Sequence, residues 1–183
     1  MVQVEIRPSK PERLDSLDVD ALVVPLYAQR AQPRGAAGLV DWRLCGRIAG
    51  LLRSERFKAA AGETVLMSGL GRLGAKRVFL FGLGAPRDRT RAELNLEVAT
   101  MVKVLSEARV DDVALAPVEA PDGSPASRRA LLSAYLAAPA WSTAAFSRLV
   151  LLDADGALGE DADALRAAAS GLGWAAGAGS KGT

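Results

Sequence analysis

The hydrophobic positions of this chain fall into short blocks whose spacing predicts strands and helices. Val2, Val4 and Ile6 alternate with polar residues as far as Pro8, which predicts a half-buried strand near a sheet edge. Residues 20–26, DALVVPL, are apolar after the first position, as is typical of a strand buried on both faces. Four more strands are predicted at Thr64–Leu70, Lys76–Gly82, Val113–Val118 and Ser147–Leu152. The glycine-rich turn between the first two has the spacing of a hairpin or another tight β connection.

Helical spacing separates most of these strands. From Val40 the apolar positions 44, 48, 51 and 52 predict one amphipathic helix with Asp41 as its N-cap. Thr90 is predicted to cap a long helix that includes Leu94 and Leu105, and a second helix runs from Ser127 to Ala138, before Pro139. A short helix is predicted at 160–169. This alternation predicts an α/β fold, a three-layer α/β/α domain with a mixed central sheet.

A chain of 183 residues is expected to form one main domain. We place that domain at residues 1–170 and interpret the glycine-rich residues 171–183 as a tail or a truncated linker. The longest apolar runs are shorter than the roughly 18 residues that cross a membrane, and the first ten residues do not resemble a signal sequence. The sequence therefore predicts a cytoplasmic protein with no membrane contact.

The amino-acid composition excludes several kinds of catalytic and metal site. The chain has no histidine and one cysteine, Cys45, which excludes the His-dependent nucleophilic triads and the common zinc sites. Cys45 is expected to be a small, at least half-buried side chain. The one acidic cluster comprises Asp153, Asp155, Glu160, Asp161 and Asp163, and its carboxylates are those that a helix N-terminus favours. We therefore predict no bound metal and no cofactor.

Charge and aromatic content bear on partners. Residues 1–91 carry a net charge of +7 and residues 92–183 one of −5, but few aromatic residues lie among the positive charges, so nucleic acid is not predicted as a partner. Trp42 and Trp141 are expected to pack, whereas Trp174 could meet a partner surface. The excess of arginine over lysine indicates a bacterial source with a GC-rich genome.

Several local runs, in this order, resemble a known family. They are DALVVPL at 20–26, Val40-Asp41 followed by Gly46, Phe57-Lys58 followed by Gly62-Glu63, AKRVFLFGLG at 75–84, and Leu131–Tyr135 ahead of Pro139. They are similar to the N-terminal domain of the leucyl aminopeptidase (cytosol aminopeptidase) family, and the resemblance extends over roughly residues 18–155. The usual glycine of the last run is missing here.

This resemblance implies a macrodomain-like fold. It also implies that catalysis belongs to a separate C-terminal domain whose lysine, aspartates and glutamate bind two divalent ions. The Asn-Thr-Asp-Ala-Glu-Gly-Arg signature of that domain is absent from this sequence. The resemblance thus favours a non-catalytic homologue, for which no catalytic residue is predicted.

The candidate site consists of two loops predicted to lie at the same end of the sheet, beyond the carboxyl ends of the strands. Gly82-Leu83-Gly84, with Arg87 and Thr90 at the following helix start, could bind a phosphate or nucleotide through backbone amides. The loop Tyr27–Gly38, which contains Gly35, would lie at the same end of the sheet. The alternative is that the glycines only let a strand turn into a loop.

Three functions remain open from the sequence. The first is a protein-binding, oligomerising or regulatory module, whose partner is a second copy, a full-length aminopeptidase or another protein. The second is a macrodomain-like module that binds ADP-ribose or a related nucleotide, which rests on analogy of fold. The third is a fragment of a manganese- or zinc-dependent leucyl aminopeptidase whose catalytic domain is missing here.

Overall fold

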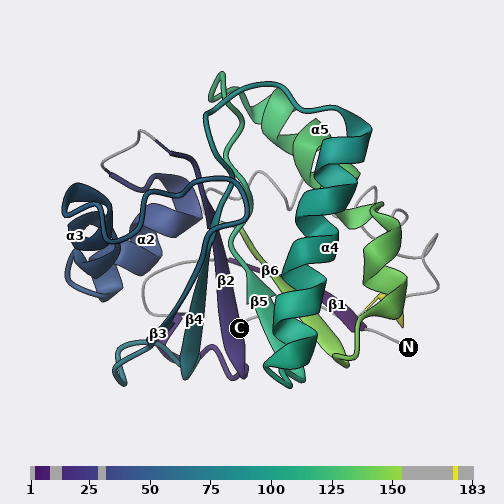
Figure 1. Ribbon diagram of the computed structural model, residues 1–183. Helices are drawn as coiled ribbons and strands as arrows, with labels where there is room; N and C mark the ends of the chain where they lie inside the picture. The colour runs from purple at the N-terminus through teal and green to yellow at the C-terminus, as the bar shows by residue number, and fades with distance from the viewer. Residues whose placement is uncertain (1–2, 9–13, 29–31, 154–174, 177–183) are drawn as a thin grey trace.

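A computed structural model of the chain describes residues 3–8, 14–28, 32–153 and 175–176 (Figure 1). Its seven-stranded sheet has the order β3-β4-β2-β5-β6-β1-β7. The strands are β1 (Gln3–Pro8), β2 (Ala21–Leu26), β3 (Thr64–Ser68), β4 (Arg77–Gly82), β5 (Asp112–Leu115), β6 (Arg148–Asp153) and β7 (Ala175–Ala176). All neighbouring strands are parallel except β3 and β4, which form an antiparallel hairpin. The predicted mixed sheet is confirmed.

Helices cover both faces of the sheet and complete the three layers (Figure 1). The helices are α2 (Gly35–Arg43), α3 (Arg47–Arg53), α4 (Arg91–Glu107), α5 (Pro125–Leu136) and the 3-10 helix η1 (Pro139–Thr143). Side chains of α2 and α3 pack with Leu22 and Val24 on one face, while α4, α5 and η1 pack with Ala21 and Val23 on the other. The strand β2 is buried on both faces, as its apolar run predicts.

The single helix predicted from Val40 is wrong, because the chain forms two helices there. Cys45 and Gly46 have positive φ angles of 55° and 75°, which end α2 before α3 begins. Asp41 does cap a helix, but its carboxylate accepts from the amides of Ile48 and Ala49, at 2.8 and 3.1 Å. Apolar spacing continues across the break, so the pattern alone could not show the left-handed turn.

Two predicted burials near this break are also wrong. Cys45 is exposed, because the left-handed turn lies at the surface. Trp42 is exposed too, with the guanidinium of Arg43 5.8 Å from its ring centroid. Trp141 packs as predicted: it is buried, donates from Nε1 to the carbonyl of Tyr135 at 2.7 Å, and meets Phe146 edge-on.

The two ends of the chain are described only in part. Ala175–Ala176 pairs in parallel with β1, so these two residues of the predicted tail lie in a strand. This pairing makes β1 the second strand from its edge. Trp174, the predicted helix at 160–169 and the rest of 171–183 lie outside the described residues, and the domain boundary at residue 170 stays a prediction. None of the described helices is long and apolar enough to cross a membrane.

Candidate functional site

The two loops chosen from the sequence lie side by side at the carboxyl ends of β2 and β4. These strands pair in parallel with Leu26 opposite Gly82. Beyond the strands, the amide of Leu83 donates to the carbonyl of Leu26 at 2.9 Å, and the amide of Ala28 donates to the carbonyl of Gly84 at 2.8 Å. The two loops therefore lie together at one end of the sheet, as predicted. Which ligand they could bind depends on the polar groups that are not already hydrogen-bonded within the chain.

The amides of Gly82, Leu83 and Gly84 all donate within the chain. Their acceptors are the carbonyls of Glu63, Leu26 and Ala59, at 2.7, 2.9 and 2.9 Å. A Cβ built on Gly82 would lie 2.1 Å from the carbonyl oxygen of Ala60, and Gly84 has a φ of 73°. Close backbone approach and a left-handed turn thus explain these glycines. The geometry supports their structural interpretation, while the predicted anion-binding role remains a hypothesis.

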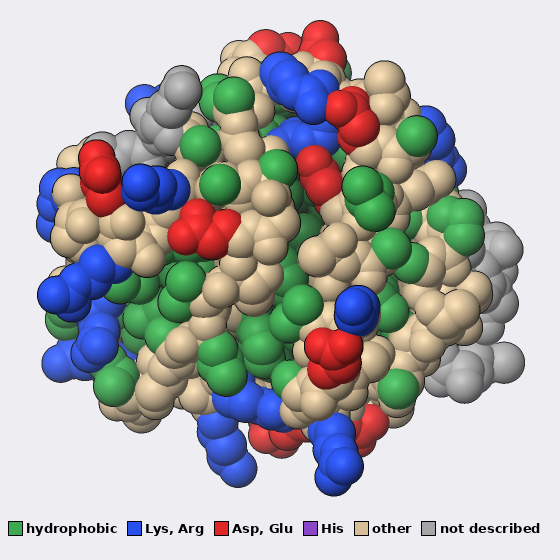
Figure 2. Space-filling view, in the orientation of Figure 1, with side chains coloured by type: hydrophobic (Ala, Val, Ile, Leu, Met, Phe, Trp, Pro, Cys, Tyr) green, Lys and Arg blue, Asp and Glu red, His purple; other side chains and the backbone are tan. Residues whose placement is uncertain are grey.

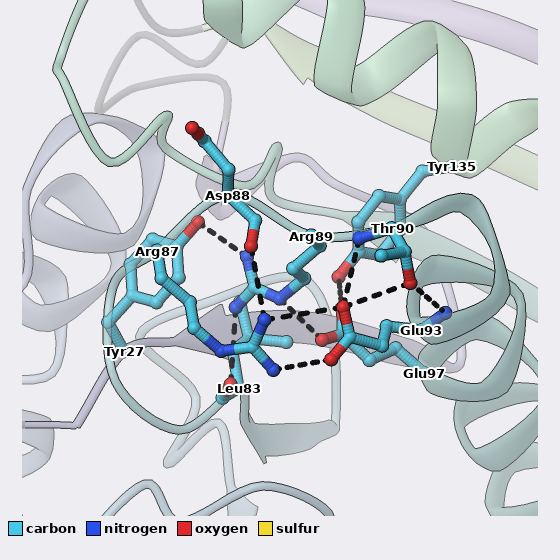
Figure 3. Close-up of polar contacts among 9 residues, drawn as sticks. All are labelled: Tyr27, Leu83, Arg87, Asp88, Arg89, Thr90, Glu93, Glu97 and Tyr135. Atoms are coloured by element: carbon cyan, nitrogen blue, oxygen red, sulfur yellow. Dashed lines mark hydrogen bonds and ion pairs between the residues drawn. The ribbon is translucent and has the colours of Figure 1, made fainter.

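Thr90 and Arg87 join a network at the start of α4 (Figure 3). Thr90 and Glu93 form a capping box, in which the Glu93 amide donates to Thr90 Oγ1 at 3.3 Å and the Thr90 amide donates to Glu93 Oε2 at 2.9 Å. Arg87 pairs with the same carboxylate, at 2.5 Å from Nη2 to Oε1. The bonds from Arg87, and then those from Thr90, lower the pKa of Glu93 to about 2.

Arg89 belongs to a second network, and this one is buried. Its side chain is 3% exposed, and Nε lies 2.5 Å from Oε1 of Glu97. Its Nη1 donates to the hydroxyl of Tyr27 at 2.9 Å, and its Nη2 donates to the carbonyl of Leu83 at 3.2 Å. The hydroxyl of Tyr135 donates to Glu97 from α5 (Figure 3). Arg89 thus joins the end of β2, the β4–α4 loop and α4.

Burial and charge shift the pKa values of this buried network. Burial raises the pKa of Glu97 despite the bonds from Tyr135 and Arg89. Burial and the neighbouring Glu97 charge raise the pKa of Tyr135 far above its usual range, so its hydroxyl stays a donor. Burial alone would lower the pKa of Arg89, but the Tyr27 bond and the Glu97 charge produce a net rise. The distance and the burial of both side chains identify Arg89 and Glu97 as a buried ion pair.

The sequence interpretation missed Glu97 and Tyr135 as members of a site, and it included Tyr27 only as the first residue of a candidate loop. A usable signal was present, because Glu93 and Glu97 are one helical turn apart and follow Arg87 and Arg89 closely. The contact with Tyr135 crosses 38 positions of the sequence, and no local pattern indicates it.

Two hollows flank these loops. One lies beyond the ends of β2 and β5, where chain connections leave the sheet on opposite faces, and Tyr27, Arg34, Pro117 and Glu119 are among its lining residues. The other lies between α4 and the segment before β3, with Leu83, Leu96, Glu97 and Met101 in its wall. Figure 2 shows hydrophobic side chains reaching the surface beside α4. Tyr27 and Glu97 connect the two hollows through Arg89.

The remaining predicted residue, Gly35, lies at the first hollow. It opens α2 with a φ of 53°, and a Cβ there would lie 1.9 Å from Oε1 of Glu119. The N-cap of this helix makes no side-chain hydrogen bond, and the carboxylate of Glu119 lies beside the first residue of the helix, at the end that favours an anion. Gly35 is thus associated with Glu119 rather than with an open cradle.

The described residues contain no group of three acidic, cysteine or histidine side chains that could hold a metal. Of the acidic cluster weighed from the sequence, Asp153 ends β6, and the other four residues lie outside the described part of the chain. The charged groups that the structure places at the candidate site are arginines paired with carboxylates.

The chain matches the model of the cytosol aminopeptidase family, N-terminal domain, over residues 23–146. A probable cytosol aminopeptidase of Alkaliphilus metalliredigens is 30% identical over 106 residues, which cover 58% of this chain and 21% of the relative. One from Alkaliphilus oremlandii is 27% identical over 107 residues, with the same coverage. This chain therefore spans about a fifth of the length of these relatives.

Solved structures show the same fold at low identity. A Trypanosoma brucei macrodomain in complex with ADP has a TM-score of 0.60 at 12% identity, over 93% of this chain and 68% of that one. The Oceanobacillus iheyensis macrodomain with MES bound has a TM-score of 0.63 at 9% identity, covering 90% and 89%. Tomato leucine aminopeptidase has a TM-score of 0.52 at 14% identity, covering 85% and 33%. The family match and this shared fold agree: the chain belongs to the cytosol aminopeptidase family, as a macrodomain-like counterpart of its N-terminal domain.

Proposed function

We propose that this chain is a non-catalytic, cytoplasmic homologue of the aminopeptidase N-terminal domain that acts through protein contact. Its partner is a second copy, a full-length aminopeptidase or another protein, and its role is assembly or regulation. The observation that carries the proposal is the internal use of the donors at the candidate site. The amides of Gly82, Leu83 and Gly84, together with the guanidiniums of Arg87 and Arg89, all bind groups of the same chain.

The energetics of these contacts support an architectural role. A buried ion pair with further hydrogen bonds is costly to break, because removal of one partner leaves an uncompensated charge. A ligand that recruited Arg89 would have to break its bonds to Glu97, Tyr27 and Leu83. The loop is thus better suited to holding three elements in place than to exchanging ligands.

An activity assay tests the non-catalytic part of the proposal. The purified chain is incubated with an aminoacyl amide while Mn²⁺ or Zn²⁺ is titrated, with EDTA as the control. We expect no turnover above the metal-only blank. Metal-dependent turnover that EDTA abolishes would overturn the proposal.

Nucleotide binding is a second candidate, favoured by the hollow at the ends of β2 and β5 in a fold shared with a macrodomain solved with ADP. Thermal unfolding with ADP-ribose tests it, since a ligand at 100 times its Kd adds about 2.7 kcal/mol of stability. Arg34 lines the hollow, whereas Arg47 begins α3 and serves as the control. A gain in stability with ADP-ribose that is lost in Arg34→Gln but kept in Arg47→Gln would support this function. No gain at millimolar ADP-ribose would exclude it.

A third candidate is that the sequence belongs to a longer, metal-dependent aminopeptidase, which is favoured by its span of about a fifth of its relatives. An immunoblot of the source cells with an antibody against this chain tests it. A band near 19.1 kDa would support a stand-alone protein, whereas a band only at several times that mass would support the longer enzyme.

A further inference from the structure

The strand β3 offers an open hydrogen-bonding edge. It is the first strand in the sheet order, so among the described residues no strand lies on its outer side. The amide of Gly82 donates to Glu63, and the amide of Gly69 donates to Lys76, which identifies the hydrogen-bonded pairs with β4. Antiparallel ladders alternate every second residue, so Val65 and Met67 bond to β4. The backbone groups of Thr64, Leu66 and Ser68 therefore point outward.

Apolar side chains are exposed along the same edge. Leu66 is 56% exposed and Leu70 is 46% exposed, and the described chain has only two other large apolar side chains in this class, Trp42 and Leu96. The sequence of β3, TVLMS, contains no charged residue. Exposed edges of monomeric proteins are commonly protected by charge or proline, and β3 has neither.

This edge is complementary to itself. If a second copy runs antiparallel with Leu66 on the two-fold axis, Thr64 of each copy lies opposite Ser68 of the other, and Leu66 lies opposite Leu66. All of these residues have outward-pointing backbone groups, so the register makes three hydrogen-bonded pairs. No like charges face each other across this strand pair.

We propose that two copies of this chain associate by antiparallel pairing of their β3 strands, centred on Leu66. The proposal rests on the proposed function, since it names the partner and the surface of a protein contact. A two-fold contact uses the same surface on both copies and closes the assembly at a dimer. Pairing would join the two sheets into one continuous sheet and bury Leu66 of each copy against the other.

Cross-linking tests the register. In a Cys45→Ser background, which removes the exposed native thiol, Leu66→Cys is compared with Leu96→Cys. Hydrogen-bonded antiparallel pairs have Cα atoms about 5.5 Å apart, within disulfide range. We expect a covalent dimer on mild oxidation from Leu66→Cys alone. Equal cross-linking of both variants, or of neither, would overturn the register.

Sedimentation equilibrium of the unmodified chain tests the association itself. We expect a reversible dimer that Leu66→Lys weakens at least tenfold, because two ammonium groups would meet at the axis. The control Leu96→Lys changes an even more exposed leucine, 69% exposed on α4, and should leave the dimer intact. A monomer at about 1 mM chain, or equal weakening by both variants, would overturn the proposal.

The two proposals can fail separately. A chain that stays monomeric but binds a full-length aminopeptidase would contradict the β3 dimer and retain the protein-contact function. Metal-dependent turnover by a dimeric chain would retain the β3 dimer and contradict the proposed non-catalytic role.

Discussion

Arg87 and Arg89 lie two residues apart in one loop, yet the structure uses them in opposite ways. Arg87 is 59% exposed and pairs with Glu93 at the surface, whereas Arg89 is 3% exposed and pairs with Glu97 inside the protein (Figure 3). The exposed pair adds to a helix cap, and water screens it. The buried pair joins β2, the loop and α4, so its loss disturbs several elements.

The different partners of Arg87 and Arg89 bear on whether this loop can bind an anion. A loop that cradles an anion needs donors that are not committed elsewhere. Here the surface guanidinium belongs to a capping network and the buried one holds the fold together. The comparison therefore supports a structural role for the arginines of this loop.

The largest expected effect comes from breaking the buried pair. Arg89→Met should lower the free energy of unfolding by about 3–5 kcal/mol, because Glu97 would remain buried without its cation. Urea unfolding measures this loss. The double variant Arg89→Met/Glu97→Met should be more stable than the sum of the single losses predicts. Strict additivity of the two losses would contradict direct coupling.

A smaller effect is expected at the helix cap. Thr90→Ala removes the acceptor for the Glu93 amide and should cost about 1 kcal/mol, whereas Thr90→Ser should keep most of the stability. Urea unfolding of both variants provides the comparison. A loss in Thr90→Ala as large as that in Arg89→Met would mean that the exposed network also holds the core.

The pH dependence of stability should separate the two glutamates by sign. Glu93 has a folded pKa of about 2, below its unfolded value, so its contribution is present above about pH 4.3 and is lost as the pH falls toward 2. Glu97 has a raised folded pKa, so its contribution is greatest below about pH 4.3 and falls as the pH rises through the folded value.

Unfolding of the unmodified chain, Glu93→Gln and Glu97→Gln from about pH 2 to 7 tests these signs. The stability difference between the unmodified chain and Glu93→Gln should shrink on acidification, and the difference for Glu97→Gln should not. Parallel profiles for the two variants would show that burial does not distinguish the carboxylates.

The smallest effect is expected for Arg87→Gln. Its guanidinium is exposed, so its loss should be smaller than that of Thr90→Ala and should shrink further in high salt. Thermal unfolding at low and high salt measures it. A salt-independent loss would indicate that this ion pair is less hydrated than its exposure implies.

Local sequence patterns were enough to predict six of the seven described strands and one important cap, whereas β7 lies in the segment predicted to be a tail. Apolar runs identified β2 and β4, glycines marked the hairpin turn, and Thr90 was a recognisable N-cap. The patterns failed where a distant contact decides the outcome. Arg87 and Arg89 look alike in sequence, and only contacts with Tyr27, Glu97 and Leu83 bury the second. The position of Glu119 beside Gly35 also follows from the sheet order, which joins segments 84 residues apart.

The most direct test of the protein-contact function is size-exclusion chromatography with light scattering on the purified chain. It is run with the chain alone, with ADP-ribose, and with a full-length aminopeptidase from the same cell. The account predicts a defined oligomer or co-elution with the enzyme, without any effect of the nucleotide. A chain that stays monomeric, ignores the enzyme and is stabilised by ADP-ribose would contradict it.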